Sequence, residues 1–281
     1  MNVSIETIFK RSDLQVIPYD EFIHYALYDD KEGYYRSNPI PFGTKGDFYT
    51  SSYVGDVFAR VIADFFIKVH EHTNIPFQIC ELGGGSGKFA KQLIESFIQK
   101  GITNGTYFFI EGHDDHREKV RSLKIHNWKI ITYPSLLEFI NEHGPIEGFM
   151  FSNEFFDAQP VPVVEMREGK LREIYIRVSE HGGLEEVSLP CREPLVQWIE
   201  KYSIRLEEGQ RIEVPLYLHT IMKQISSSLT KGIVLTIDYG YTNEEWQDPR
   251  RRDGSLRGYY QHEQYSNVLE HVGKMDITHH I

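Results

Sequence analysis

Short apolar runs alternate with helix-forming segments through much of the chain. The apolar runs are bounded by turn residues and occupy positions 77–80, 107–111, 129–133, 149–152 and 233–239. Helical segments separate the first four runs, at positions 87–100, 114–123 and 135–143. Strands that alternate with helices in this way form a parallel sheet with helices on both faces. We therefore predict a doubly wound α/β core.

Two helices are expected before this core. Residues 19–28 carry apolar side chains at helical spacing. In residues 53–72, apolar side chains recur every four positions, at Val57, Val61, Phe65 and Val69. This spacing predicts an amphipathic helix whose apolar stripe faces the core. A polar loop rich in Gly and Pro joins the two helices.

Residues 158–230 interrupt the alternation of strands and helices. Apolar and polar residues alternate around Gly169 and around Gly182–Gly183, which is typical of antiparallel hairpins. A helix-forming stretch follows before the apolar run at 233–239. We interpret the region as an insertion of antiparallel β-hairpins beside the core, rather than as a separately folding domain.

The composition restricts the partners and the location of the protein. Hydrophobic residues make up 40% of the chain and charged residues 25%, as in globular proteins. With 30 Lys and Arg against 41 Asp and Glu, the net charge is -11, so the chain lacks the basic field that nucleic acid binding requires. The two cysteines form no paired motif, which fits a reducing compartment. Because we find neither an apolar run of membrane-spanning length nor a targeting segment, we expect a soluble, cytoplasmic protein.

The stretch ICELGGGSGKFA, residues 79–90, carries the first candidate chemistry. A Walker phosphate loop needs Gly, four further residues, Gly-Lys and then Ser or Thr. Here Phe89 follows Lys88, and Leu82 stands where the first glycine belongs. A Walker loop is therefore excluded.

Two other ligands fit the same stretch. A dinucleotide pattern can be placed on Gly85, Gly87 and Ala90, but it leaves the Glu81 carboxylate beside a pyrophosphate. The pattern acid-x-Gly-x-Gly-x-Gly, which runs from Glu81 through Gly83 and Gly85 to Gly87, is the signature of doubly wound methyltransferases that use S-adenosylmethionine (SAM). The ammonium and sulfonium of SAM suit a carboxylate, and glycines let the backbone approach the ligand closely. We favour SAM as the cofactor.

A second acid is expected where the next strand ends, to bind the ribose hydroxyls. Glu111 ends the run YFFIE and is the candidate, because strand-end acids in doubly wound sheets face the ligand crevice. The alternative role for Glu111 is to cap a helix that begins near Asp114.

Several segments together resemble the MidA-like methyltransferases. The matching segments follow the family's order: FIHYALYDDKEGYY (22–35), GDFYTSS (46–52), ELGGGSGKFA (81–90), SNEFFDAQPV (152–161), IDYGY (237–241), RRDGSLRGYYQH (251–262) and DITHH (276–280). They span nearly the whole chain, and NEFFDAQP together with GDFYTS is specific. The resemblance implies a class I, Rossmann-like SAM-dependent methyltransferase. It also implies methylation of an arginine in a partner protein, such as the respiratory complex subunit that mitochondrial members modify.

The resemblance also suggests how the chain is organised. We expect an N-terminal helical and loop region over residues 1–70 that covers the cofactor site. Residues 71–281 would form the Rossmann-like core with its insertion at about 158–230. Family members continue well beyond the DIT segment, whereas this sequence stops at Ile281, so we expect the closing strands of the sheet to be absent from it.

The segment SNEFFDAQP supplies the residues that we expect to bind the substrate. A guanidinium stays protonated at every accessible pH, with a pKa above about 12, so carboxylates must grip and orient it, and a pair of acids can do so as a bidentate clamp. Glu154 and Asp157 follow a strand directly and form such a pair. Asn153 would orient one of these acids or the methionyl part of SAM. The alternative is that Asp157 caps a turn before Pro160.

Further polar residues complete the candidate site. The loop with Gly46, Asp47 and Thr50 is either a lid over SAM, as the resemblance suggests, or a simple helix cap. Asp238 ends the strand IVLTID, and Tyr239 would supply an aromatic wall to the same crevice. No histidine pair has supporting ligands at zinc-type spacing, so we expect no structural metal.

Two rival functions follow from the same residues. One is a non-catalytic binding or assembly protein with a SAM-type fold, which the expected absence of the closing strands favours and the full set of acids opposes. The other is a nicotinamide-dependent oxidoreductase, which rests only on the relaxed glycine pattern. The leading hypothesis is a SAM-dependent protein arginine methyltransferase.

Overall fold

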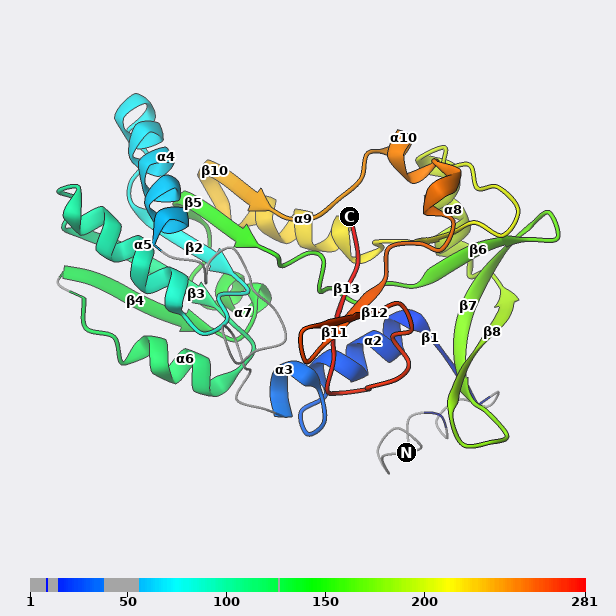
Figure 1. Cartoon of the computed structure of the whole chain (residues 1–281). Helices are drawn as coiled ribbons and strands as arrows, with labels where there is room; N and C mark the ends of the chain where they lie inside the picture. Colours follow the sequence, from blue (N-terminus) through cyan, green and yellow to red (C-terminus); the bar gives the residue numbers. More distant parts are fainter. Residues whose placement is uncertain (1–8, 10–14, 38–55, 126) are drawn as a thin grey trace. The chain divides into compact units, whose positions relative to one another are not determined.

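The structure of the chain is a computed structural model that describes residue 9 and residues 15–37, 56–125 and 127–281. The chain groups into two compact units (Figure 1). The first, which we call the antiparallel unit, contains Met1–Pro41, Phe156–Leu218 and Tyr239–Ile281. The second, the parallel unit, contains Phe42–Phe155 and His219–Asp238.

The parallel unit is built on a five-stranded parallel sheet. The strand order is β10-β5-β2-β3-β4, with β2 (Gln78–Leu82), β3 (Asn104–Ile110), β4 (Asn127–Tyr133), β5 (Ile146–Asn153) and β10 (Leu229–Ile237). Every neighbouring pair runs parallel. The five apolar runs of the sequence are these five strands, so the predicted doubly wound core is confirmed. All five carboxyl ends therefore meet at one edge of the sheet.

Helices separate the strands as predicted. Four of them follow or precede strands of the sheet, namely α5 (Lys88–Gln99), α6 (Asp114–Arg121), α7 (Leu136–Glu142) and α9 (Tyr217–Ser227). The N-terminus of α7 is capped by Ser135, whose side chain accepts the backbone N–H of Glu138 at 3.2 Å. The rings of Phe89 in α5 and Phe151 in β5 stack with their centroids 4.8 Å apart, so α5 packs against the sheet through this contact.

The helix α4 (Val57–Thr73) exists as predicted, but its buried face is a different one. The expected stripe lies largely in solvent, since Val57, Val61 and Phe65 are 60%, 58% and 40% exposed. The core side chains of the helix are Ala59, Ile62, Ala63 and Phe66. These positions follow the i, i+3, i+4, i+7 rule and make a wider stripe than a single row at spacing four. The two alanines let the helix lie close to its neighbours.

The antiparallel unit contains two sheets. The larger joins β1 (Val16–Pro18), β7 (Lys170–Val178), β6 (Val163–Arg167) and β9 (Arg211–Glu213), and β8 (Leu184–Pro190) also pairs with β7. The smaller contains β11 (Arg257–Tyr260), β12 (Glu263–Tyr265) and β13 (Asp276–Thr278). The two predicted hairpins are confirmed, because β6 and β7 flank Gly169 and β7 and β8 flank Gly182–Gly183. Both Gly169 and Gly182 have positive φ.

Helices complete the antiparallel unit. They are α2 (Tyr19–Tyr28), α3 (Tyr34–Ser37), α8 (Glu193–Lys201), α10 (Asn243–Trp246) and the short 3-10 helix Pro249–Arg251. The predicted helix at 19–28 is confirmed, and its apolar side chains lie in the core with Ile174 and Ile176 of β7. None of the helices in the described ranges is both long and apolar enough to cross a membrane.

The grouping of residues cuts across the boundaries proposed from the sequence. Strand β1 pairs antiparallel with β7, so the N-terminal residues share a sheet with the hairpin region. A partly buried group of ion pairs supports this arrangement: the half-buried Arg192 lies 2.6 Å from the fully buried Glu173 of β7 and 3.0 Å from Asp20 of α2. The helix α4, in contrast, packs on α5 in the parallel unit. The idea that residues 1–70 cover a cofactor site stays a prediction.

The two faces of α4 offer a direct test of the packing. Phe66 is fully buried and stacks on Phe149 at 4.5 Å, whereas the neighbouring Phe65 is 40% exposed. We expect Phe66→Ala to lower the free energy of unfolding by about 3–5 kcal/mol because it leaves a cavity. Phe65→Ala is the matched control, with a loss below about 1 kcal/mol. Urea unfolding of both variants measures the difference, and equal losses would contradict this orientation of α4.

Candidate functional site

The glycine turn connects β2 to α5 at the carboxyl edge of the parallel sheet. Gly83, Gly85 and Gly87 all have positive φ, of 67°, 54° and 74°, a region that glycine enters without steric penalty. The backbone N–H groups of Gly83 and Gly84 donate to the carbonyl of Ile110 at 2.9 and 3.2 Å. The turn is therefore held against the end of β3, where Glu111 follows.

Close packing requires glycine in the same turn. A Cβ atom at Gly84 would overlap the ring of Phe109, and one at Gly87 would overlap the side chain of Val120. At Gly83 a Cβ would lie 2.8 Å from the Phe155 ring. Gly84 was not among the residues singled out from the sequence pattern, because its φ is ordinary and only the neighbouring ring excludes a side chain.

Glu111 is tied to the glycine turn through its carboxylate. Its Oε2 accepts the N–H of Gly85 at 2.8 Å, and its Oε1 accepts the N–H of His113 at 2.8 Å. Arg117 donates to the Glu111 carbonyl at 2.6 Å. Burial raises the pKa of Glu111, while the two backbone hydrogen bonds lower it. The structure thus brings Glu111 and Gly85 together, as the cofactor hypothesis requires.

Glu81 lies in the same unit and is only 5% exposed. The hydroxyl of Tyr107 donates to its Oε2 at 2.9 Å. Burial raises the pKa of Glu81 to about 8, the Tyr107 hydrogen bond acts to lower it, and the negative charge of Glu111 acts to raise it. Tyr107 was missed by the sequence reasoning, since in the run YFFIE it looks like one more buried aromatic residue.

The ends of β5 and β10 carry the next group of predicted residues. Asn153 ends β5, and Glu154 follows it with φ of 49°, a left-handed conformation that is uncommon outside glycine. The Glu154 N–H donates to the Ile237 carbonyl at 2.9 Å. Asp238 accepts the N–H of Phe155 at 3.1 Å. One role of Asp238 is therefore to hold the turn that carries Glu154.

The remaining predicted residues are not among the described residues of the parallel unit. Asp157 and Tyr239 belong to the antiparallel unit, where Asp157 is buried and its carbonyl accepts the N–H of His279 at 2.9 Å. Tyr239 is half exposed. Gly46, Asp47 and Thr50 lie outside the described residues. Within the described ranges, no three His, Cys, Asp or Glu side chains are grouped as metal ligands.

The donor set around the glycine turn fits an adenosyl ligand with a cationic end. Each oxygen of Glu111 accepts one N–H, which leaves lone pairs for two ribose hydroxyls. Glu81 is a buried carboxyl with a raised pKa, and a nearby positive charge favours the ionised form of such a group. Gly83, Gly84, Gly85 and Gly87 leave the backbone of the turn uncovered by side chains at these four positions. Glu81, the glycines and Glu111 are therefore the residues that would hold SAM.

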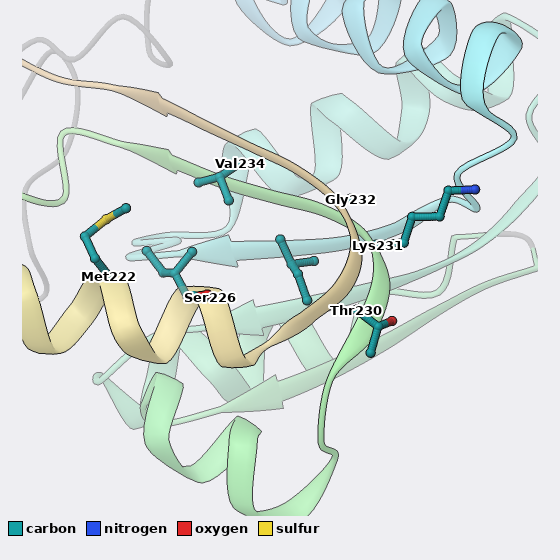
Figure 2. A pocket seen from close by; sticks show the side chains of 8 residues that line it. Met222, Ser226, Thr230, Lys231, Gly232 and Val234 are labelled. Atoms are coloured by element: carbon teal, nitrogen blue, oxygen red, sulfur yellow. The ribbon is translucent and has the colours of Figure 1, made fainter.

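A separate shallow pocket lies between the end of α9 and the first half of β10 (Figure 2). Its volume is about 380 Å³, and Met222, Ile225 and Val234 supply its apolar lining. Its one charged lining residue, Lys231, donates to the carbonyl of Thr73 at 3.2 Å. The pocket contains none of the predicted site residues.

Comparison with known proteins identifies the class. A family model described as a putative S-adenosyl-L-methionine-dependent methyltransferase matches residues 59–281. The chain belongs to this family, which confirms the resemblance drawn from its motifs. The family's description names S-adenosyl-L-methionine, the cofactor that the glycine turn predicted.

Individual relatives are more distant. The rat mitochondrial protein arginine methyltransferase NDUFAF7 is 25% identical over 92% of this chain and 62% of its own length. The mitochondrial homologue from Drosophila melanogaster is 23% identical over 93% of this chain and 64% of its own length. The chain thus spans less than two thirds of these relatives.

A solved structure confirms the fold. A COG1565 superfamily member from Burkholderia thailandensis, bound to S-adenosyl-homocysteine, superposes with a TM-score of 0.84. It is 21% identical, and the match covers 99% of this chain and 73% of that one. The likeness supports the α/β methyltransferase fold assigned from the sequence.

The raised pKa of Glu81 predicts a pH-dependent stability. The group has a higher pKa folded than unfolded, so its contribution to stability is present below about pH 4.5 and is lost as the pH rises through about 8. We expect Glu81→Gln to raise the free energy of unfolding of the ligand-free chain at pH 8 by roughly 2–4 kcal/mol, and by little at pH 5.

The matched control for this change is Glu118→Gln, on the exposed side of α6. It should leave the pH dependence of urea unfolding as in the wild type. If Glu81→Gln also followed the wild-type curve, the pKa assigned to Glu81 would be wrong.

Proposed function

We propose that this chain is a SAM-dependent methyltransferase that transfers a methyl group to an arginine nitrogen of a partner protein. The observation that carries the proposal is the hydrogen bond from Gly85 to Glu111 at 2.8 Å, which joins the glycine turn to the acid at the end of β3. Family membership and the names of the arginine methyltransferase relatives support it.

SAM, when bound, supplies a methyl group on a sulfonium. The chain's own task is to position the acceptor nitrogen in line with that methyl group and to exclude water from the pair. Glu111 binds the ribose hydroxyls, and Glu81 balances the positive end of the ligand. The glycine turn lets the backbone come close to the adenosyl group.

Carboxylates act on the substrate side. A guanidinium is positively charged at every accessible pH, so Glu154 binds it and orients one nitrogen. That Asp157 is the second acid stays a prediction from the sequence. The left-handed backbone of Glu154 supports a functional role, because a non-glycine residue keeps such a conformation only where its surroundings impose it. Asp238 holds the turn through the N–H of Phe155, and Asn153 orients one of the acids or the methionyl part of SAM.

The partner is proposed from the relatives and the location from the composition. The relatives' names point to a protein substrate with an arginine. Those relatives are mitochondrial by name, whereas the cytoplasmic location expected for this chain rests on its sequence alone. The net charge of -11 supports a cationic protein segment as the substrate, and opposes nucleic acid.

Cofactor binding is the first test of the proposal. We expect micromolar binding of SAM in a calorimetric titration and no binding of NAD. Glu111→Ala should weaken SAM binding by about 30-fold or more, because two hydrogen bonds to a charged group are lost. Glu118→Ala on the exposed side of α6 is the matched control.

A folded chain that binds NAD and not SAM would be an oxidoreductase, and one that binds neither would favour the non-catalytic assembly role.

Methyl transfer tests the role of Glu154. With a pool of arginine-rich peptides and SAM, mass spectrometry should detect methylarginine with the wild-type chain. Glu154→Gln should reduce the rate about 100-fold or more, since the carboxylate orients the reacting group, while SAM affinity changes less than about twofold. Glu147→Gln, an exposed change on β5, is the control. Full transfer by Glu154→Gln would show that this assignment is wrong.

A further inference from the structure

Tyr107 is a buried tyrosine in β3, the strand next to the central strand β2 of the parallel sheet. It is fully buried among Phe109, Phe149 and Phe151. The next two residues of the strand, Phe108 and Phe109, carry the same ring without a hydroxyl. A buried hydroxyl lowers stability unless it has a partner, and the partner of Tyr107 is the Glu81 carboxylate, 2.9 Å away.

The strand register explains why these two side chains meet. Across β2 and β3, Tyr107 pairs with Ile79, and Glu81 pairs with Phe109. Tyr107 and Glu81 are therefore diagonal neighbours on one face of the sheet, a spacing that a long aromatic side chain can bridge. The hydrogen bond from Tyr107 on the neighbouring strand therefore fixes the orientation of the Glu81 carboxylate. Glu81 lies near the end of β2, where the glycine turn begins.

The charges that face Glu81 are few. Across the described ranges, no Lys, Arg or His forms an ion pair with it; the groups that act on its ionisation are the Tyr107 hydroxyl and the Glu111 carboxylate. Cys80, next to it on β2, is a buried thiol. Among the described residues, Tyr107 is thus the one neighbour that stabilises the charged form of Glu81, while burial and Glu111 oppose it.

We propose that Tyr107 is a positioning residue of the cofactor site, whose hydroxyl orients the Glu81 carboxyl toward a cationic ligand and favours its charged form. The inference rests on the proposed function only in taking SAM as that ligand. It adds that SAM binding is linked to deprotonation of Glu81. When the cation binds, the Glu81 carboxyl loses its proton to the solvent, and the carboxylate remains hydrogen-bonded to Tyr107.

The coupling has a definite sign. Since the pKa of Glu81 in the free chain is raised to about 8, the group is largely protonated at pH 7, and SAM binding should release nearly one proton there. As the pH is raised toward 8, SAM affinity should increase by up to about tenfold per pH unit, and above about pH 8 it should stay constant. The Tyr107 hydroxyl lowers the pKa of Glu81. Its removal should therefore raise the pH above which SAM affinity no longer increases.

The experiment is calorimetric titration of SAM into the full chain and into Tyr107→Phe, from pH 6 to 9, in two buffers with different ionisation enthalpies. We expect the variant to bind about 10-fold more weakly at pH 7, with the difference shrinking as the pH rises and the proton release persisting to higher pH. Tyr133→Phe removes a hydroxyl from the same sheet on the face that packs against Phe139, and is the matched control.

The results for Tyr107→Phe distinguish a positioning role of Tyr107 from a purely structural one. Unchanged affinity and proton release in a folded Tyr107→Phe would overturn the proposal. An equal loss at every pH would also overturn it, since it would show a purely structural effect. In a Glu81→Gln background, Tyr107→Phe should have no pH-dependent effect on affinity.

Failure of the proposed function is distinguishable from failure of this inference. If the chain bound no SAM, ¹³C NMR of labelled glutamate would still report the Glu81 titration in the ligand-free protein. A midpoint near 8 that moves upward in Tyr107→Phe would support the positioning role. An ordinary midpoint that is the same in both proteins would reject it.

Discussion

Two carboxylates, the buried Glu81 and the partly buried Glu111, lie at the carboxyl edge of one parallel sheet. Burial raises the pKa of both, and the negative charge of Glu111 raises the pKa of Glu81 further. Such an arrangement lowers stability unless hydrogen bonds or a bound cation compensate for it. Glu111 receives two backbone N–H groups, and Glu81 receives the hydroxyl of Tyr107.

The glycine turn has its place in the same arrangement. Only residues without a side chain can take the positive φ of the turn and also fit against Phe109 and Val120. This conformation of the glycine turn also places the Gly85 N–H within hydrogen-bond distance of Glu111. Backbone conformation, aromatic packing and acid position thus meet at the site that we propose for SAM, a ligand with ribose hydroxyls and positive charge.

Much of this was predictable because it depends on local patterns. Strand and helix alternation, the glycine signature and the strand-end acids can all be read from short stretches. The buried face of α4 was predicted wrongly, because the row at spacing four competes with the wider stripe around Ile62 and Phe66. The pairing of β1 with β7 joins residues far apart in sequence, and the Tyr107–Glu81 contact depends on register across two strands. Neither leaves a signal in a single sequence.

The most direct measurement of the central claim is a crystal structure of the chain soaked with S-adenosyl-homocysteine. We predict density at the glycine turn, with the ribose hydroxyls on Glu111 and the amino-acid end of the ligand on the side of Glu81. Density for the ligand at another place, or a well-ordered glycine turn that stays empty at saturating ligand, would contradict the claim that these two acids form the cofactor site.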